Sequence, residues 1–286
     1  MLEHIVSSID LKIDRALRAI RELDGAVVAL SAGVDSSLVA FFAHKALADR
    51  AIAATGVSES LPPGELEVAI RTADELGIKH VIVRTNELHN QDYSSNPADR
   101  CYYCKDTLYH ELRILANNLH FDAILDGTHT DDLSDDRPGL KAAREAGVQS
   151  PLLEAGFSKQ DVRNAARRFG LSIWDKPAMP CLSSRVAHGE PITEDKLAAI
   201  GRAESFIRSL TGVRNLRVRY EKSLARIEVS PEERRLFFDE NLMNQVDRQL
   251  REIGFSSVTL DLRGYQRKER SGVSDSWVLP LADVSP

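Results

Sequence analysis

The sequence predicts an α/β fold in which a parallel-sheet domain is followed by a smaller α+β domain. Over the first two thirds of the chain, short β-branched runs alternate with segments in which apolar residues recur at helical spacing, as in parallel α/β sheets. A segment containing Pro177, Pro180 and Gly189 then interrupts this alternation, and the order of elements changes after it. With 286 residues, the chain is long enough for two domains, which we expect at residues 1–190 and 191–286.

The first domain is expected to contain four strands with helical sequence between them. The strands are expected at residues 26–30, 51–57, 80–85 and 121–125, and the helices at residues 36–47, 64–76, 105–117, 140–145 and 161–169. Gly170 follows the last of these helices, at the position where a left-handed residue commonly ends a helix. Residues 174–190 are expected to form a loop that carries a cysteine and an arginine.

The second domain is expected to combine helices and strands in a different order. Its expected elements are helices at residues 194–210 and 232–253 and strands at residues 213–220, 225–229 and 257–262. Because these elements do not alternate regularly, they predict an α+β domain and not a continuation of the parallel sheet.

The composition is that of an ordinary globular protein. Hydrophobic residues make up 43% of the chain and charged residues 28%, so disorder is not expected. The 37 basic and 43 acidic residues give a net charge of −6, which provides no overall attraction for nucleic acid or anionic membranes. Apolar stretches are far shorter than the roughly 20 residues that a membrane span needs. There is no secretory signal pattern and the cysteine count is odd, so we expect a cytoplasmic protein with reduced thiols.

A loop suited to a nucleotide lies between the first expected strand and the helix after it. Its candidate nucleotide-binding residues are Ser31, Gly33, Asp35, Ser36 and Ser37. Gly33 permits a positive φ and a close approach to a phosphate, and the following helix offers free backbone N–H groups to an anion. Asp35 is suited to holding a metal ion or a ribose. The loop lacks the lysine of the G-x-x-x-x-G-K-[ST] motif, and its alternative interpretation is a serine cap on an ordinary helix.

A second candidate segment follows the fourth expected strand. Gly127 and Thr128 come directly after Asp126 there, and open α/β sheets bind ligands at the carboxyl ends of their strands. We therefore add Gly127 and Thr128 to the candidate nucleotide-binding residues. The alternative is that these residues only form the first turn of the next segment.

The loop at residues 31–37 resembles the S-G-G-x-D-S motif of the ATP pyrophosphatases, with Ala32 where the motif has its first glycine. Those enzymes cleave ATP between the α and β phosphates and adenylate a carbonyl or carboxyl oxygen. The resemblance implies an adenine nucleotide hydrolase-like first domain that uses ATP and holds pyrophosphate in this loop. Mg²⁺ is expected as well, because the loop has no lysine to neutralise the leaving pyrophosphate.

Three cysteines form the second chemical signal. Cys101 and Cys104 are separated by two residues just before an expected helix, and Cys181 lies in the loop expected at residues 174–190. A structural zinc site would need a fourth ligand, for which His188 is only a loose candidate. A redox dithiol would use the first two cysteines alone, whereas a [4Fe–4S] cluster on three thiolates would leave one iron open to a ligand such as sulfide. Plain buried cysteines are a fourth interpretation, and the residues by themselves leave all four open.

Several further segments, taken together with the nucleotide loop, resemble one family of ATP pyrophosphatases. They are residues 99–105, 135–142, 174–177, 181–185, 216–219 and 225–228. This combination, which spans nearly the whole chain, is similar to the ATP-dependent sulfur transferases that make the nickel-pincer cofactor of lactate racemase.

The family resemblance implies a role for each cysteine. Members that have only the cysteine matching Cys181 resemble sacrificial donors, whose cysteine gives up its sulfur and becomes dehydroalanine. Members with three cysteines resemble cluster enzymes, in which a [4Fe–4S] centre carries the transferable sulfide. Since this chain has all three, the resemblance implies that Cys101, Cys104 and Cys181 are catalytic and bind the cluster.

The resemblance also implies a substrate and partners. The substrate would be a pyridinium dicarboxylic acid mononucleotide, of which a carboxyl is adenylated and then converted to a thiocarboxylate. The sulfur would come from inorganic sulfide or a thiol donor. The protein would form a homo-oligomer, a hexamer by family resemblance, with no membrane or nucleic acid partner.

Arginines are the candidates for the phosphate of that substrate, because a guanidinium group binds phosphate in a bidentate manner. Arg217 and Arg219 alternate with apolar residues on an expected strand, so both side chains point to one face of it. The alternative interpretation is that this face is only a solvent-facing strand edge. Arg185, four residues after Cys181, is expected to bind phosphate or carboxylate beside the sulfur, or else to pair with an acid. Glu228 completes the candidate substrate-binding set as a salt-bridge partner of these arginines.

Three other functions remain open from the sequence. A tRNA-thiolating enzyme of the same superfamily would need an RNA-binding appendage or basic strip, and a synthetase that uses ammonia would not need three thiols. A nucleotide sensor without catalysis would leave the cysteines unexplained. We assign no role to His129. The family more often has an arginine directly after the aromatic residue that matches Tyr265, whereas this chain has Gln266 there and Arg267 next, so we assign no role to these two either.

Overall fold

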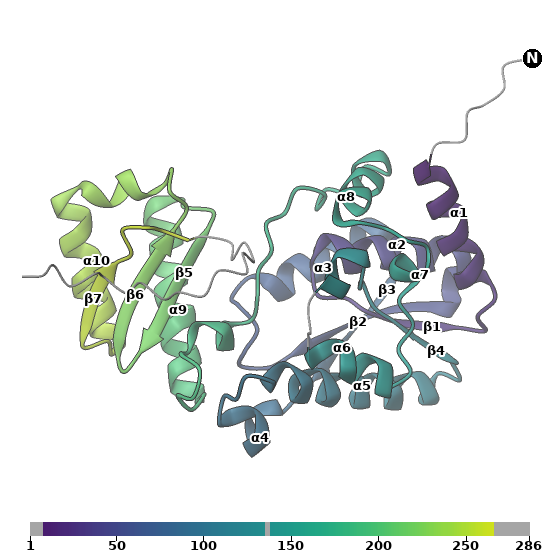
Figure 1. The fold of residues 1–286 in the computed structure, drawn as a ribbon, viewed down its shortest axis with the longest axis horizontal. Coiled ribbons are helices and arrows are strands. Elements are labelled where there is room, and N and C mark those ends of the chain that lie inside the picture. Colours follow the sequence, from purple (N-terminus) through teal and green to yellow (C-terminus); the bar gives the residue numbers. More distant parts are fainter. Residues whose placement is uncertain (1–7, 135–137, 266–286) are drawn as a thin grey trace, which may run out of the picture.

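The computed structural model describes residues 8–134 and 138–265, which form two β-sheets with helices packed on them. The two sheets lie in separate lobes, with the purple-to-teal part of the chain in one and the green-to-yellow part in the other (Figure 1). This arrangement confirms the predicted α/β fold with a smaller second sheet. Within the described ranges, we find no helix with the length and apolar character that a membrane crossing requires.

The first sheet is four-stranded and entirely parallel. Its strands are β1 (Ala26–Ala29), β2 (Ala51–Val57), β3 (Lys79–Arg84) and β4 (Ala123–Leu125), in the order β3-β2-β1-β4. The chain therefore moves outward from β1 to β3 and then returns to the other side of β1. The loops after β1 and β4 therefore leave the carboxyl edge of the sheet in opposite directions. Open α/β sheets bind ligands in the crevice between two loops that diverge in this way.

Helices cover both faces of this sheet because successive side chains of its buried strands point to opposite sides. Ala26 and Val28 pack with helices on one face, whereas Val27 and Ala29 pack with helices on the other. The first face carries α1 (Ser8–Arg21), α2 (Val34–Leu47), α3 (Glu65–Leu76), α7 (Pro151–Glu154) and α8 (Lys159–Arg168), and the second carries α5 (Arg100–Asn118) and α6 (Pro138–Glu145). The sequence analysis did not predict α1.

The helix expected at residues 105–117 starts earlier than predicted, at Arg100. It follows the short helix α4 (Gln91–Ser94) and a turn in which Asn96 has a φ of 60°. Cys101 and Cys104 are therefore in the first turn of α5 and not in front of a helix. Tyrosine and cysteine have only moderate helix propensity, so the residue pattern did not reveal this start.

The second sheet consists of β5 (Leu216–Glu221), β6 (Leu224–Val229) and β7 (Ser257–Leu260), packed on α9 (Glu194–Thr211) and α10 (Glu240–Ile253). Strands β5 and β6 are antiparallel, whereas β6 and β7 are parallel. The single helix expected at residues 232–253 is wrong, because a short 3₁₀ helix, Arg234–Phe238, precedes α10. Asp239 separates the two with an extended backbone and caps α10 by accepting a hydrogen bond from the Leu242 N–H.

The loop that carries Cys181 is anchored in the core of the second lobe. Leu182 and Val186 pack in the same cluster as residues of α9 and β5. Between them, the fully buried Arg185 forms a bidentate ion pair with Glu204, with its Nε 2.8 Å from Oε1 and its Nη2 3.1 Å from Oε2. Because both charges are buried, each depends on the other for compensation.

Replacement of Glu204 by glutamine is expected to destabilise the protein by about 3–5 kcal/mol at neutral pH, the cost of leaving a buried charge unpaired. Burial acts to raise the pKa of Glu204, but the hydrogen bonds and charges of Arg185 and Arg208 hold that pKa below its usual value. A lowered folded-state pKa gives stability that is present above the unfolded-state pKa and disappears as the pH falls through the folded-state value.

Urea denaturation of wild type and Glu204→Gln at a series of pH values measures this effect. The two free energies of unfolding should differ most at neutral pH and converge in acid. Equal stability at neutral pH would show that the pair does not hold the loop in place.

Candidate functional site

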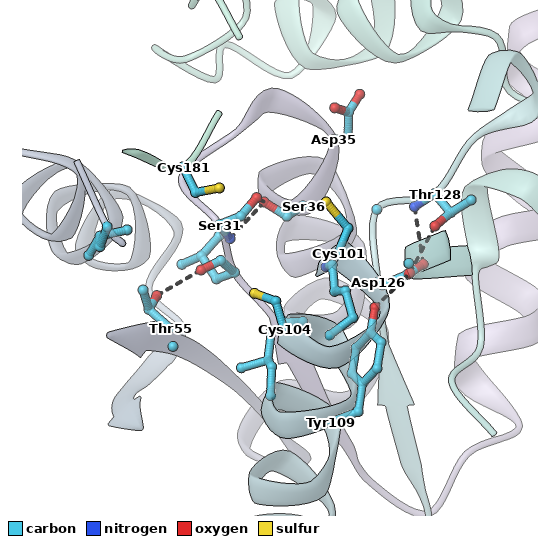
Figure 2. Close-up of a pocket in the computed structure, with 18 of the residues that line it drawn as sticks. Ser31, Asp35, Ser36, Thr55, Cys101, Cys104, Tyr109, Asp126, Thr128 and Cys181 are labelled. Atoms are coloured by element: carbon cyan, nitrogen blue, oxygen red, sulfur yellow. Dashed lines mark hydrogen bonds between the residues drawn. The ribbon is translucent and has the colours of Figure 1, made fainter. Parts of the chain in front are cut away.

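A cavity of about 860 Å³ opens at the carboxyl edge of the parallel sheet. Its walls come from the ends of β1, β2 and β4, the first turns of α2 and α5, and the loop that contains Cys181. Figure 2 shows the labelled side chains of the nucleotide loop on one side of this space and the three cysteine sulfurs beside them. The topology therefore brings the two chemical signals of the sequence into one cavity.

Serine hydroxyls hold the nucleotide loop in a compact turn at the start of α2. The Ser31 N–H donates to Ser36 Oγ at 3.1 Å, and the hydroxyls of Ser36 and Ser37 donate to the Gly33 carbonyl at 3.1 and 2.8 Å. Gly33 itself is extended, with a φ of −94°, so the positive φ that a glycine permits is not used at this residue. The left-handed residue is its neighbour Ala32, with a φ of 55°.

Two lysines from distant segments reach the nucleotide loop. Lys159, at the start of α8, places its Nζ 2.5 Å from Asp35 Oδ2. Lys176 donates from its Nζ to the Ala32 carbonyl at 2.9 Å and also pairs with Glu65 at 2.7 Å. The loop itself has no lysine, as the sequence shows, but these two lysines from other segments bring positive charge to it. The only sequence signal for Lys176 was its place in the segment 174–177.

His129 also lies at this end of the cavity, although the sequence analysis assigned it no role. It is buried, and its Nε2 is 3.7 Å from Asp35 Oδ1. Lys159 and His129 thus both approach the Asp35 carboxylate. A carboxylate can bind a cation, and the basic groups beside it can bind an anion. This arrangement therefore suits an anionic ligand that carries a bound cation.

Gly127 is glycine because the loop after β4 presses directly against the nucleotide loop. A Cβ atom at Gly127 would lie 2.6 Å from the Ser36 nitrogen and 2.8 Å from the Asp35 carbonyl carbon. Thr128 is fixed next to it, since its N–H and hydroxyl both donate to the Asp126 carboxylate, at 3.1 and 2.8 Å. The two loops that the sequence analysis singled out are therefore in contact.

The three cysteines come from two elements but point into the same cavity (Figure 2). Cys101 and Cys104 lie in the first turn of α5, and Cys181 directly precedes the 3₁₀ helix Leu182–Arg185. Burial, followed by the negative charges of Glu87 and Cys181, raises the pKa of the Cys104 thiol.

Three thiols that line one cavity match the number of protein ligands on a [4Fe–4S] cluster with one open iron. Each thiolate on such a cluster binds a different iron, so the sulfurs surround a cavity and do not converge on one point. Within residues 8–134 and 138–265, no three His, Cys, Asp or Glu side chains gather closely enough to hold a metal ion. The fit consists of three cysteines on the wall of one cavity large enough for a ligand.

The candidate substrate-binding arginines face the loop that carries Cys181. Arg217 is buried and donates from Nη2 to the Ala178 carbonyl at 3.0 Å, and Arg219 donates from Nη1 to the Ser184 carbonyl at 2.7 Å. Glu228 pairs with Arg219 at 2.9 Å, as expected. Burial, and then the positive charge of Arg185, lower the pKa of Arg217 to about 10, so Arg217 remains charged at neutral pH.

Arg185 uses its guanidinium within the protein. Besides the pair with Glu204, it donates to the carbonyls of Pro180 and Cys181 at 2.5 and 2.9 Å. It therefore fixes the backbone of the Cys181 loop, and it takes the acid pairing that the sequence analysis gave as its alternative. Gln266 and Arg267 lie outside the described residues.

Comparison with known proteins connects the site to two groups of enzymes. A family model described as NAD synthase matches residues 5–100, which contain the nucleotide loop. The glutamine-hydrolyzing GMP synthase of Aeropyrum pernix is 28% identical over 227 residues, which cover 73% of this chain and 42% of that enzyme. The family model covers the nucleotide loop and the first three strands of the parallel sheet.

Two other relatives are similar over most of the chain. An uncharacterized protein of Synechocystis sp. is 46% identical over 258 residues, or 90% of this chain and 96% of that protein. The pyridinium-3,5-bisthiocarboxylic acid mononucleotide synthase of Lactiplantibacillus plantarum is 39% identical over 252 residues, or 87% of this chain and 89% of that enzyme. The similarity therefore includes both sheets and the loop between them.

Replacement of Gly127 by alanine is expected to disturb the nucleotide loop. The added methyl group would meet the backbone of Asp35 and Ser36, so the first turn of α2 must shift, at a cost of about 1–3 kcal/mol in stability. ATP affinity, measured by calorimetry, should fall as well. Gly33→Ala is the matched control for stability, because its methyl group would meet only Ser31 Oγ, at 3.5 Å. Wild-type stability and ATP affinity in Gly127→Ala would contradict this account of the contact.

Proposed function

The chain belongs to the family of the pyridinium-3,5-bisthiocarboxylic acid mononucleotide synthase, and from this membership we propose that it is an ATP-dependent sulfur transferase of nickel-pincer cofactor biosynthesis. Its substrate in this proposal is a pyridinium dicarboxylic acid mononucleotide, and its product is the corresponding thiocarboxylate. The observation that carries the proposal is the single cavity that unites a pyrophosphatase-type nucleotide loop with three thiols.

In the first step, a substrate carboxylate oxygen attacks the α-phosphorus of ATP. A new P–O bond forms, the bond between the α-phosphorus and the oxygen that bridges to the β-phosphorus breaks, and pyrophosphate leaves with the electron pair. We assign the binding of the pyrophosphate to Ser31, Gly33, Asp35, Ser36 and Ser37, and that of the neighbouring nucleotide to Gly127 and Thr128. The contacts of Lys159 and Lys176 with the loop support a role for both in neutralising the phosphates.

Mg²⁺ is part of this proposal as a partner of the pyrophosphate. Carboxylate oxygens are preferred ligands of Mg²⁺, and the side chains of Asp35, Asp131 and Asp132 line the nucleotide end of the cavity. When bound, the ion would reduce the negative charge on the leaving pyrophosphate.

In the second step, a sulfur nucleophile attacks the carbonyl carbon of the acyl adenylate, and AMP leaves. We propose that Cys101, Cys104 and Cys181 hold a [4Fe–4S] cluster, which supplies this sulfur when bound. The alternative is sacrificial. Cys181 Sγ would attack the carbonyl and form a thioester, then loss of the Cα proton and cleavage of the Cβ–S bond would release the thiocarboxylate and leave dehydroalanine. Inorganic sulfide or a thiol would be the sulfur source for the cluster route.

The arginines of β5 provide the substrate phosphate site in this proposal. Arg217 and Arg219 point to the Cys181 loop, and the ion pair with Glu228 orients Arg219. Arg185 is a positioning residue, because its side chain contacts the loop backbone and Glu204. We retain residues 1–190 as the nucleotide-binding domain and 191–286 as a substrate-binding and oligomerisation domain of a cytoplasmic homo-oligomer.

The protein is expected to convert ATP to AMP and pyrophosphate in the presence of the pyridinium dicarboxylic acid mononucleotide. Asp35→Ala should abolish this conversion, since it removes the carboxylate that Lys159 and His129 approach. Asp49→Ala, at an exposed site, is the matched control. Chromatography of the nucleotides measures the result, and ADP with free phosphate would contradict cleavage between the α and β phosphates.

The cluster route predicts that anaerobic reconstitution gives about four irons per chain and a visible absorption band. Replacement of any one of Cys101, Cys104 or Cys181 by alanine should then remove both the iron and the thiolated product. Iron analysis and mass spectrometry of the protein and product measure this.

The sacrificial route predicts a different pattern for the same variants. Cys101→Ala and Cys104→Ala would still form product, and the mass of the wild-type protein would fall by that of H₂S after one turnover. That result would overturn the cluster route and support donation from Cys181.

A further inference from the structure

Glu87 is a buried carboxylate on the wall of the cavity. It lies in the 3₁₀ turn Glu87–His89 after β3, and its exposed fraction is 2%. The hydroxyls of Ser58 and Ser60 both donate to its Oε1 atom, at 2.5 and 2.9 Å. Its Oε2 atom is also buried but has no hydrogen-bond partner in the part of the chain that the structure describes. One oxygen of this cavity-lining carboxylate therefore has no donor among the described residues.

Glu87 also differs from Glu65 and Asp35, two other acids of this cavity, in whether a cationic side chain pairs with it. Glu65 pairs with Lys176 and Asp35 with Lys159, whereas no lysine, arginine or histidine among the described residues forms an ion pair with Glu87. A carboxylate removed from water without a cation is costly, and buried charges are normally paired. The structure thus has a place for a positive charge that comes from outside the chain.

Glu87 lies at the thiol end of the cavity. Its neighbour Leu88 packs in the same cluster as Cys104 and Tyr93, and burial followed by the negative charge of Glu87 raises the pKa of Cys104. Its partner Ser60 contacts the other cysteine loop, since the Leu182 N–H donates to the Ser60 carbonyl at 2.8 Å. The positive charge that Glu87 lacks would therefore sit at the thiol end of the cavity, where the carboxyl of the substrate must meet sulfur.

Among the organic reactants of the proposed function, only the pyridinium ring is a cation, and the proposed Mg²⁺ is assigned to the pyrophosphate at the nucleotide end of the cavity. ATP and sulfide are anions, and the substrate carboxylates and phosphate are negative as well. We propose that Glu87 is the counter-ion of the pyridinium ring and positions that ring beside the thiols; this inference rests on the proposed function. A pyridinium ring carries no N–H group, but its positive charge polarises the ring C–H groups, which can approach a carboxylate oxygen. The Oε2 atom of Glu87, which has no N–H or O–H donor among the described residues, therefore suits a pyridinium ring as its partner.

Ring charge can be changed with little change in shape, and this provides a direct test. Pyridinium-3-carboxylic acid mononucleotide and its 1,4-dihydropyridine form share the ribose, phosphate and carboxylate, but only the first has a cationic ring. Calorimetric titration of the wild-type protein with each should show that the cationic ring binds about tenfold more tightly or better, as expected for a buried opposite charge. Glu87→Gln should lose this preference and retain its affinity for ATP.

Glu65→Gln is the matched control. It removes a carboxylate from the same cavity, but one whose charge Lys176 already compensates. It should keep the preference for the cationic ring. If Glu87→Gln fails to fold, the wild-type comparison alone decides, since equal binding of the two mononucleotides overturns the inference. A loss of ATP affinity in Glu87→Gln with an unchanged ring preference would overturn it too, and would assign Glu87 to ATP.

The outcome also separates this inference from the function on which it rests. If the wild-type protein binds neither mononucleotide, the proposed substrate class is wrong and the inference falls with it. If it binds both with equal affinity and still forms the thiolated product, only the role of Glu87 is wrong.

Discussion

The buried ion pair between Arg185 and Glu204 is the interaction on which the placement of the third thiol depends. Glu204 lies in α9, and it accepts a hydrogen bond from the Val218 N–H of β5 in addition to those from Arg185. Arg185 in turn holds the carbonyls of Pro180 and Cys181. A chain of polar contacts thus runs from the second sheet to the cysteine. The position of Cys181 beside a nucleotide loop of the first sheet is therefore set by residues of the second.

The two ends of the cavity differ in charge, and this difference suits the proposed reactants. At the nucleotide end, Lys159 and Lys176 provide positive charge next to backbone N–H groups at the start of α2, which favours phosphates. At the thiol end, Glu87 provides an uncompensated negative charge, which disfavours phosphates and favours a cationic ring. The phosphates of ATP and the cationic ring of the substrate would therefore be held at opposite ends of the cavity, with the ring beside the thiols.

The strands of the first sheet and the nucleotide loop could be predicted because each depends on residues that are neighbours in the sequence. The contacts of Lys159 and Glu87 could not, because they arise where the chain returns to the sheet edge, 124 residues after Asp35 in the case of Lys159. The start of α5 was missed for a local reason, since the cysteines and tyrosines at residues 101–104 have only moderate helix propensity and no regular apolar spacing. Arg185 was expected to bind a ligand, because the sequence does not show that Glu204, 19 residues later, lies within hydrogen-bond distance of it.

Ala32 shows how a departure from the family motif is accommodated. A left-handed alanine costs roughly 1–2 kcal/mol relative to glycine, because its Cβ approaches the following carbonyl oxygen. The Ala32 carbonyl accepts a hydrogen bond from the charged Nζ of Lys176, and such bonds contribute about 1.5–3 kcal/mol. Its methyl group is buried in the core between α2 and the sheet, which adds a small apolar contribution. The two gains offset the strain, so the loop keeps its conformation although the motif's first glycine is missing.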